Sequence, residues 1–265
     1  MPEDLREVSH VTGVELDPVT ARIARLLQPR ARIVSSDFAR TELPPRFDLA
    51  IGNPPFSDRT VRSDRALRSL RLRLHDYFIV KAINLLKPGA LAAFVTSHGT
   101  MDKADGAARE LIAQHADLVS AIRLPEGSFR ADAGTDVVID ILFFRRRKPG
   151  EPEGDLSWLD LEEVRPATED EGAIRVNRWF TRHPGLVLGM HALTAGPFGE
   201  TYTCLPKPGE DLRLALDEAI TRLPDAIYNG EPEPIDFDVE EADYEASVHV
   251  TADRHVREGS FFFDK

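Results

Sequence analysis

The sequence predicts an α/β protein built on an open sheet of mostly parallel strands. Short apolar runs alternate with amphipathic stretches from Val11 to about Lys148. Proline and glycine residues lie at the positions where helices are expected to begin and end. Parallel strands need long crossover connections, which are usually helices, so a strand–helix rhythm is typical of such a sheet.

The expected strands are short runs rich in Val, Ile, Leu, Phe or Ala, and turn residues bound each of the early ones. They cover Val11–Leu16, Arg32–Ser35, Phe47–Gly52, Ala90–Ser97, Leu118–Arg123 and Asp136–Arg145.

Three helices are expected between these strands. Pro18–Leu27 starts with proline at the first helical position, where the missing N–H has no helical partner to lose. Asp76–Leu86 carries apolar residues at helical spacing and meets a strong stop signal, Lys-Pro-Gly, at 87–89. Asp105–His115 follows the same pattern.

The character of the chain changes after a basic stretch that ends at Gly150. We therefore expect a core over residues 1–149 and an extension of irregular α+β structure over 150–229, with one amphipathic helix at Leu212–Leu223. Residues 230–265 read as an acidic linker and the start of a further segment.

Composition narrows the functional classes. The chain is 42% hydrophobic and 29% charged, and no apolar run approaches the roughly 20 residues that span a bilayer. The acidic start is unlike a signal peptide, and the single cysteine, Cys204, fits a cytoplasmic location. The eight histidines show no metal-ligand spacing, so no metal is expected. His98 follows the strand 90–97 and is interpreted as a polar turn residue, with a position lining the site as the alternative.

Charge is distributed unevenly along the chain. Residues 1–150 hold 23 Lys and Arg against 19 Asp and Glu, whereas residues 151–265 hold 10 against 26. The total of −12 argues against a nucleic-acid partner, but the core alone does not, and the charge of each segment is the relevant quantity.

The sharpest chemical feature is the tetrapeptide Asn53-Pro54-Pro55-Phe56, which follows the strand 47–52 directly. Open α/β sheets bind ligands beyond the carboxyl ends of their strands. The two prolines fix the backbone, so the Asn53 side-chain oxygen and the Pro54 carbonyl can accept both hydrogens of one exocyclic amino group. Phe56 offers a face on which a planar base can stack. The pattern predicts methyl transfer to an amino nitrogen.

This tetrapeptide resembles motif IV of the amino-methyltransferases, known best from DNA adenine-N6 methyltransferases. The resemblance covers roughly residues 11–148 and implies a Rossmann-like sheet that binds S-adenosyl-L-methionine and acts on adenine in DNA, in a restriction-modification or mobile-element system. The resemblance implies that Asn53 and Pro54 hold the target amino group and that Asn53 also lies beside the cofactor. It implies that Phe56 stacks on the flipped base. The parent protein is expected to be larger, such as a methylase fused to a helicase-like domain.

Two upstream strand ends resemble the family's cofactor motifs. Glu15, with Leu16 beside it, matches the acidic residue that binds the cofactor ribose, while Asp17 is the better candidate for a helix cap. Asp37 and Phe38 match the pair that reads the cofactor adenine. The order of the three motifs, each after its own strand, is more specific than any one of them.

The sequence departs from the family at its start. The first strand and its glycine-rich loop, which hold the methionine part of the cofactor, should precede the acidic strand end by roughly 20 residues. Only fourteen residues precede Glu15, and their one glycine, Gly13, belongs to the Glu15 strand. We therefore expect a sheet that lacks its first strand, with a gap at its centre, and an upstream segment or partner chain that supplies the loop.

An arginine-rich segment follows the tetrapeptide and is expected to track DNA phosphates beside the flipped base. The alternative is a solvated surface balanced by Asp58, Asp64 and Asp76. The arginines are Arg59, Arg62, Arg65, Arg68, Arg71 and Arg73.

Two other functions stay open. The same tetrapeptide serves methyltransferases that act on RNA adenine or on a glutamine amide in protein. The missing cofactor loop alternatively favours a catalytically inactive fragment or a nucleic-acid-binding module.

Overall fold

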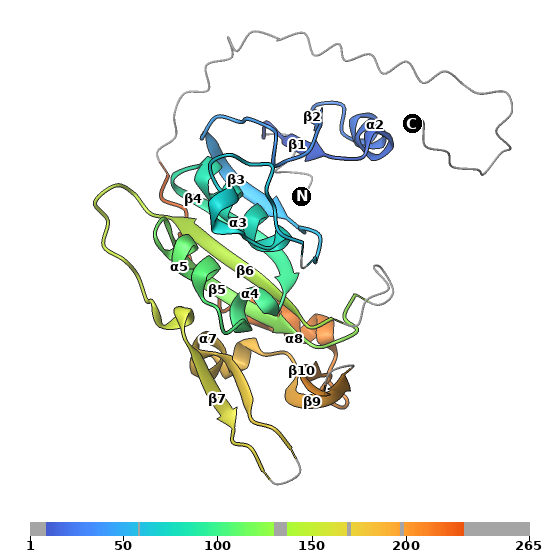
Figure 1. The fold of residues 1–265 in the computed structure, drawn as a ribbon, viewed down its shortest axis with the longest axis vertical. Helices are drawn as coiled ribbons and strands as arrows, with labels where there is room; N and C mark the ends of the chain where they lie inside the picture. The colour runs from blue at the N-terminus through green and yellow to red at the C-terminus, as the bar shows by residue number, and fades with distance from the viewer. Residues whose placement is uncertain (1–8, 58, 130–136, 169–170, 197–198, 231–265) are drawn as a thin grey trace, which may run out of the picture. The chain divides into compact units, whose positions relative to one another are not determined.

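The computed structural model describes residues 9–57, 59–129, 137–168, 171–196 and 199–230 (Figure 1). The chain divides into two units, Met1–Glu231 and Pro232–Lys265. The second unit lies outside the described residues, and so does the acidic linker expected there. In the part of the chain that is described, no helix is long and apolar enough to cross a membrane.

The described chain begins with a strand–helix–strand unit. Strand β1 (Thr12–Glu15) pairs in parallel with β2 (Arg32–Ser35), and helix α2 (Pro18–Leu27) connects them. Asp17 caps α2, since its carboxylate accepts the Thr20 backbone N–H at 2.7 Å. The expected α2 and β2 have these bounds, and β1 is one residue shorter at each end.

The main sheet has four strands in the order β3-β4-β6-β5. Strand β4 pairs in parallel with β3, whereas β6 is antiparallel to both β4 and β5. The sheet is therefore mixed, with β6 running against the other three strands, and the α/β class is confirmed. The strands are β3 (Phe47–Gly52), β4 (Leu86–Ser97), β5 (Ala116–Leu124) and β6 (Ile139–Arg146).

Helices α3 (Leu74–Leu85), α4 (Gly99–Asp102) and α5 (Ala107–Ala113) accompany this sheet and contribute buried side chains to its core. Helix α3 ends one residue before the predicted stop, and β4 starts at once. Pro88 lacks an N–H and disfavours helical backbone in the residue before it. Gly89 has φ of 82°, and a Cβ there would lie 2.5 Å from the Asn229 side chain, so only glycine fits.

The two parallel strand pairs of the core belong to separate sheets. Strands β1 and β2 form a separate two-stranded sheet, and β1 does not pair with β3. On β3, Leu49 is 42% exposed and Ile51 is 63% exposed, which is unusual for a strand beside the centre of an α/β sheet. Apolar residues of α2 are also exposed. These are Val19, Ile23, Leu26 and Leu27.

The C-terminal extension contains two antiparallel hairpins and short helices, in keeping with the mixed structure expected there. The 3-10 turns are η1 (Arg68–Leu70), η2 (Ser157–Leu159) and η3 (Pro184–Leu186). The other elements are β7 (Leu161–Arg165), β8 (Ile174–Asn177), α7 (Arg178–Arg182), β9 (Met190–Gly196), β10 (Gly199–Leu205) and α8 (Leu212–Ile220), three residues shorter than predicted.

Candidate active site at the carboxyl edge of the sheet

The tetrapeptide 53–56 begins where β3 ends, at Gly52. Pro54 is buried, Asn53 and Pro55 are exposed, and Phe56 is half-buried against the hydrophobic core. Within the described residues, the Asn53 side chain has no hydrogen-bond partner. A buried proline thus anchors the turn while the neighbouring amide stays free for a ligand.

The register of β3 and β4 fixes what lies beside the tetrapeptide. Gly52 pairs with Phe94, and β4 continues to Ser97 before His98 follows. The tetrapeptide and His98 therefore follow neighbouring strands at the same edge of the sheet. Leu124, at the end of β5, and Ile139, at the start of β6, belong to the same edge because they pair with each other and Ile139 also pairs with Ser97.

The two acids predicted to contact the cofactor lie together on the smaller sheet. Glu15 pairs with Ser35, so Asp37 follows on the same edge. One Glu15 oxygen accepts the Asp17 backbone N–H at 2.9 Å, and Asp37 accepts the Ala39 N–H at 2.9 Å. Each carboxylate keeps acceptor capacity for a hydroxyl or amino group.

The flanking residues of these acids differ in their surroundings. Leu16 is 70% exposed, so its apolar side chain is accessible to a ligand. The Phe38 ring packs on Phe78, with ring centres 5.0 Å apart, and the Phe38 carbonyl accepts from Lys81 at 2.6 Å. Since Lys81 belongs to α3, this contact ties the end of β2 to the helix that precedes β4.

The arginine-rich segment is exposed and largely uncompensated. Asp64 turns inward, where its carboxylate accepts the Tyr77 hydroxyl at 2.7 Å, and Asp76 is buried and accepts from Thr100 at 3.0 Å. These two carboxylates therefore do not balance the arginines, and Asp58 lies outside the described residues. Five arginines are exposed with no ion pair to any described residue. They are Arg59, Arg62, Arg65, Arg68 and Arg71.

A buried ionic cluster at the same edge escaped the sequence analysis. The Arg123 guanidinium is fully buried and forms two 2.8 Å bonds to Asp140 and one of 2.7 Å to Asp102. It also donates to the Tyr202 hydroxyl at 3.1 Å, which links β5 to the β9–β10 hairpin. Burial alone would lower the pKa of Arg123, but the two carboxylates raise it well above its usual value. The sequence signal for this cluster is a charged residue, Arg123, inside the apolar run of β5.

His98, at the same edge, packs against the C-terminal extension. Its ring lies 5.4 Å from the Tyr202 ring, and its Nδ1 is buried without a hydrogen-bond partner among the described residues. Burial lowers the pKa of His98, so the imidazole is neutral near pH 7.

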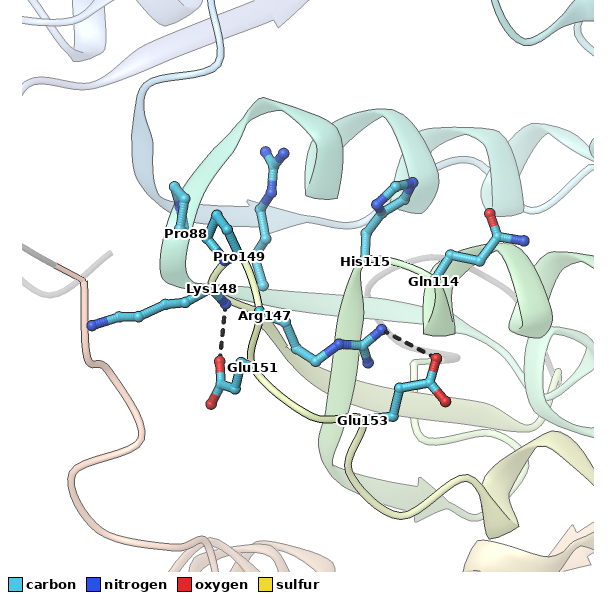
Figure 2. A pocket seen from close by; sticks show the side chains of 10 residues that line it. Pro88, Gln114, His115, Arg147, Lys148, Pro149, Glu151 and Glu153 are labelled. Carbon is cyan, nitrogen blue, oxygen red and sulfur yellow. Dashed lines mark hydrogen bonds and ion pairs between the residues drawn. The ribbon is translucent and has the colours of Figure 1, made fainter.

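A cavity of about 370 Å³ lies at the opposite edge, between the start of β4 and the end of β6 (Figure 2). Its walls include Pro88, Arg146 and Arg147, and none of the predicted site residues. Arg146 donates to the Asn84 carbonyl at 2.8 Å, and Arg147 donates to Asp117 at 2.7 Å. Because these guanidinium groups are occupied by the protein itself, the cavity has no part in the site. No group of three His, Cys, Asp or Glu in the described ranges could hold a metal ion.

Comparison with known proteins gives related sequences and structures. Residues 22–129 match the Eco57I restriction-modification methylase family. The type II methyltransferase M.CvrRI of Paramecium bursaria Chlorella virus XZ-6E is 30% identical over 154 residues, which cover 56% of this chain and 40% of that protein. The chain thus spans well under half the length of this relative.

Two solved structures have similar but distant folds. A modification subunit of a putative type I restriction enzyme from Vibrio vulnificus YJ016 has a TM-score of 0.46 and 20% identity, over 81% of this chain and 51% of that one. A putative class I S-adenosylmethionine-dependent methyltransferase from Listeria monocytogenes has a TM-score of 0.47 and 19% identity, over 55% and 47%.

Proposed function

We propose, from the match of residues 22–129 to the Eco57I restriction-modification methylase family, that the chain is the core of a DNA adenine-N6 methyltransferase in a restriction-modification system. The observation that carries the proposal is the free Asn53 amide at the carboxyl end of β3, held next to the buried Pro54. The finer fold assignment, a Rossmann-like methyltransferase sheet without its first strand, rests on the separate β1–β2 pair.

In this mechanism the tetrapeptide holds and orients the amino nitrogen of a flipped adenine. The Asn53 side-chain oxygen and the Pro54 carbonyl each accept one amino hydrogen, which leaves the nitrogen lone pair free to attack. Phe56 stacks on the base. No strong general base is required, because the methylated ammonium product loses its proton readily.

The residues of the smaller sheet suit the adenosine half of S-adenosyl-L-methionine, which supplies an activated methyl group when bound. Glu15 would accept from the ribose hydroxyls and Asp37 from the adenine amino group, with Leu16 and Phe38 beside the ring. The described residues before Glu15 contain no glycine-rich loop for the methionine half. We propose that a partner chain supplies it.

The exposed arginines would bind DNA phosphates next to the site. Each neutralised phosphate steepens the dependence of log affinity on log salt by about 0.9 in duplex DNA. Replacing Arg62, Arg65 and Arg68 with glutamine should therefore flatten this slope by up to about 3.

The matched control replaces three arginines of the extension that already pair with carboxylates. Arg175, Arg178 and Arg182 lie 3.6, 2.9 and 3.4 Å from their acidic partners. Glutamine at these positions should leave the slope unchanged, and equal effects in both triple variants would contradict the assignment.

The reaction itself is tested by following tritium from methyl-labelled S-adenosylmethionine into DNA, RNA and protein at saturating cofactor. DNA should be labelled, and Asn53→Ala should lower the rate by at least about a hundredfold, as loss of a transition-state hydrogen bond does. Because Asn53 is exposed, this variant should fold normally. Labelling of RNA or of a protein amide in place of DNA would instead support the related substrates of this motif.

An inactive nucleic-acid-binding module is the competing reading, and the unpaired edges of β1 and β3 favour it. DNA binding without methyl transfer at saturating cofactor would support this reading. We also propose a cytoplasmic location, since the one cysteine, Cys204, is free and buried.

A further inference from the structure

His98 occupies a distinctive place at the carboxyl edge of the sheet. It follows β4, the strand that pairs in parallel with β3, so His98 and the tetrapeptide leave neighbouring strands at the same edge of the sheet. Its backbone is fixed, because the His98 N–H donates to the Val138 carbonyl at 3.0 Å. The side chain is therefore presented one strand away from the tetrapeptide.

The C-terminal extension holds this imidazole in place. The Tyr202 ring packs against it at 5.4 Å with an interplanar angle of 53°. The Tyr202 hydroxyl is held in turn by Arg123 at 3.1 Å and by His191 Nδ1 at 2.8 Å. Two carboxylates fix Arg123, and Arg123 in turn fixes the Tyr202 hydroxyl. The His98 ring therefore packs against a side chain whose position is restrained.

One polar atom of this assembly is unsatisfied. Buried polar atoms in native proteins nearly always have a hydrogen-bond partner, and an exception calls for a ligand or water. The His98 Nδ1 is such an exception among the described residues. A neutral imidazole offers one donor and one acceptor nitrogen, which suits the ring nitrogens and amino groups of a nucleobase.

We propose that His98 contacts the target base and recognises it as adenine through a hydrogen bond from Nδ1, with Tyr202 as the positioning residue that orients the imidazole. This proposal rests on the proposed function and gives the C-terminal extension a part in substrate recognition. It adds a specificity-determining contact to the hydrogen bonds that Asn53 and Pro54 would accept from the amino group.

The test observes His98 directly in the full chain. The imidazole nitrogens are followed by ¹⁵N NMR during titration with short single-stranded oligodeoxyadenylate and, separately, oligodeoxythymidylate, and His98→Gln assigns the signal. Only the adenine oligonucleotide should shift the Nδ1 resonance. Equal shifts with both oligonucleotides, or none at saturation, would overturn the proposal.

Substitutions separate contact from structural support. Asparagine places its amide nitrogen near Nδ1 and glutamine near Nε2. His98→Ala and His98→Gln should therefore weaken adenine-oligonucleotide binding about tenfold, the effect of one hydrogen bond, while His98→Asn restores most of it. Thymine-oligonucleotide affinity should not change, whereas a merely structural role would lower both affinities together.

Tyr202 variants complete the test. Tyr202→Phe keeps the ring against His98 and should retain most adenine discrimination, and Tyr202→Ala should lose it. If His98 variants discriminate normally while Asn53→Ala still abolishes DNA methylation, this inference fails and the proposed function stands. If the chain neither binds nor methylates DNA, the proposed function fails.

Discussion

At the scale of single residues, Arg123 is the side chain whose loss should destabilise the protein most. It is fully buried between Asp140, also fully buried, and Asp102. Arg123→Met would leave carboxylates buried without a cation, which typically costs about 3–5 kcal/mol. Chemical denaturation of the variant and the parent measures this difference in unfolding free energy.

The control is an ion pair at the surface. Arg178 lies 2.9 Å from Asp160, with side chains 35% and 60% exposed. Water screens such a pair, so Arg178→Met should cost less than about 1 kcal/mol. Comparable losses in the two variants would mean that the Arg123 cluster contributes no more than a solvated pair.

Three partly desolvated histidines set a pH dependence of stability. Desolvation lowers the pKa of the half-buried His98 and His191 and of the more exposed His115 below the usual 6.5, and nearby arginines also lower that of His115. The unfolded chain therefore binds more protons just below pH 6.5, and stability should fall as the pH drops through this window. Asp76 acts in the opposite sense above pH 3.8, because burial raises its carboxyl pKa.

His115 isolates the histidine contribution. Desolvation is the first cause of its lowered pKa, followed by Arg146 and Arg147, with no carboxylate involved. Denaturation of His115→Gln at neutral pH and at about pH 5.5 should show a smaller loss of stability than the parent shows. An unchanged difference would remove His115 from the explanation.

At the scale of elements, the parallel strands were predictable because their signals are local. β2 and β3 have the predicted bounds, since turn residues flank compact apolar runs. The Asn53 turn follows from β3 for the same reason. The Arg123–Asp140 pairing was not predictable, because it depends on cross-strand register between residues 17 apart in sequence.

The position of His98 shows the same limit. Its neighbour on the chain, Ser97, ends a strand in the structure as the sequence predicts. Its packing against Tyr202 involves a residue more than a hundred positions later, and no local pattern encodes that contact. Local sequence thus predicts where the strand ends but not what packs beside it.

The open edge of β3 should make the isolated protein prone to self-association. Unpaired edges with apolar side chains template further pairing, and charge on the edge suppresses it. Ile51, 63% exposed, is the position to change. Ile51→Lys should reduce concentration-dependent association in sedimentation experiments without lowering stability. Ile122→Lys, at a fully buried position on β5, should unfold the protein.

At the scale of the whole molecule, the residues proposed to bind the cofactor account for only part of it. Glu15 and Asp37 lie on one sheet edge with free acceptor capacity, and within the described residues β1 pairs only with β2 and β3 only with β4. The described residues thus offer contacts for adenosine but no glycine-rich loop for the methionine half. The chain alone should therefore bind S-adenosylmethionine weakly.

Calorimetry with two ligands separates this explanation from simple misfolding. If only the adenosine half is held, adenosine and S-adenosylmethionine should bind with affinities that agree within about threefold, a difference of less than 1 kcal/mol. Asp37→Asn should weaken both to the same extent, because the substitution replaces one acceptor oxygen with a donor. Micromolar binding of S-adenosylmethionine together with much weaker binding of adenosine would contradict the prediction, since residues within this chain would then hold the methionine half.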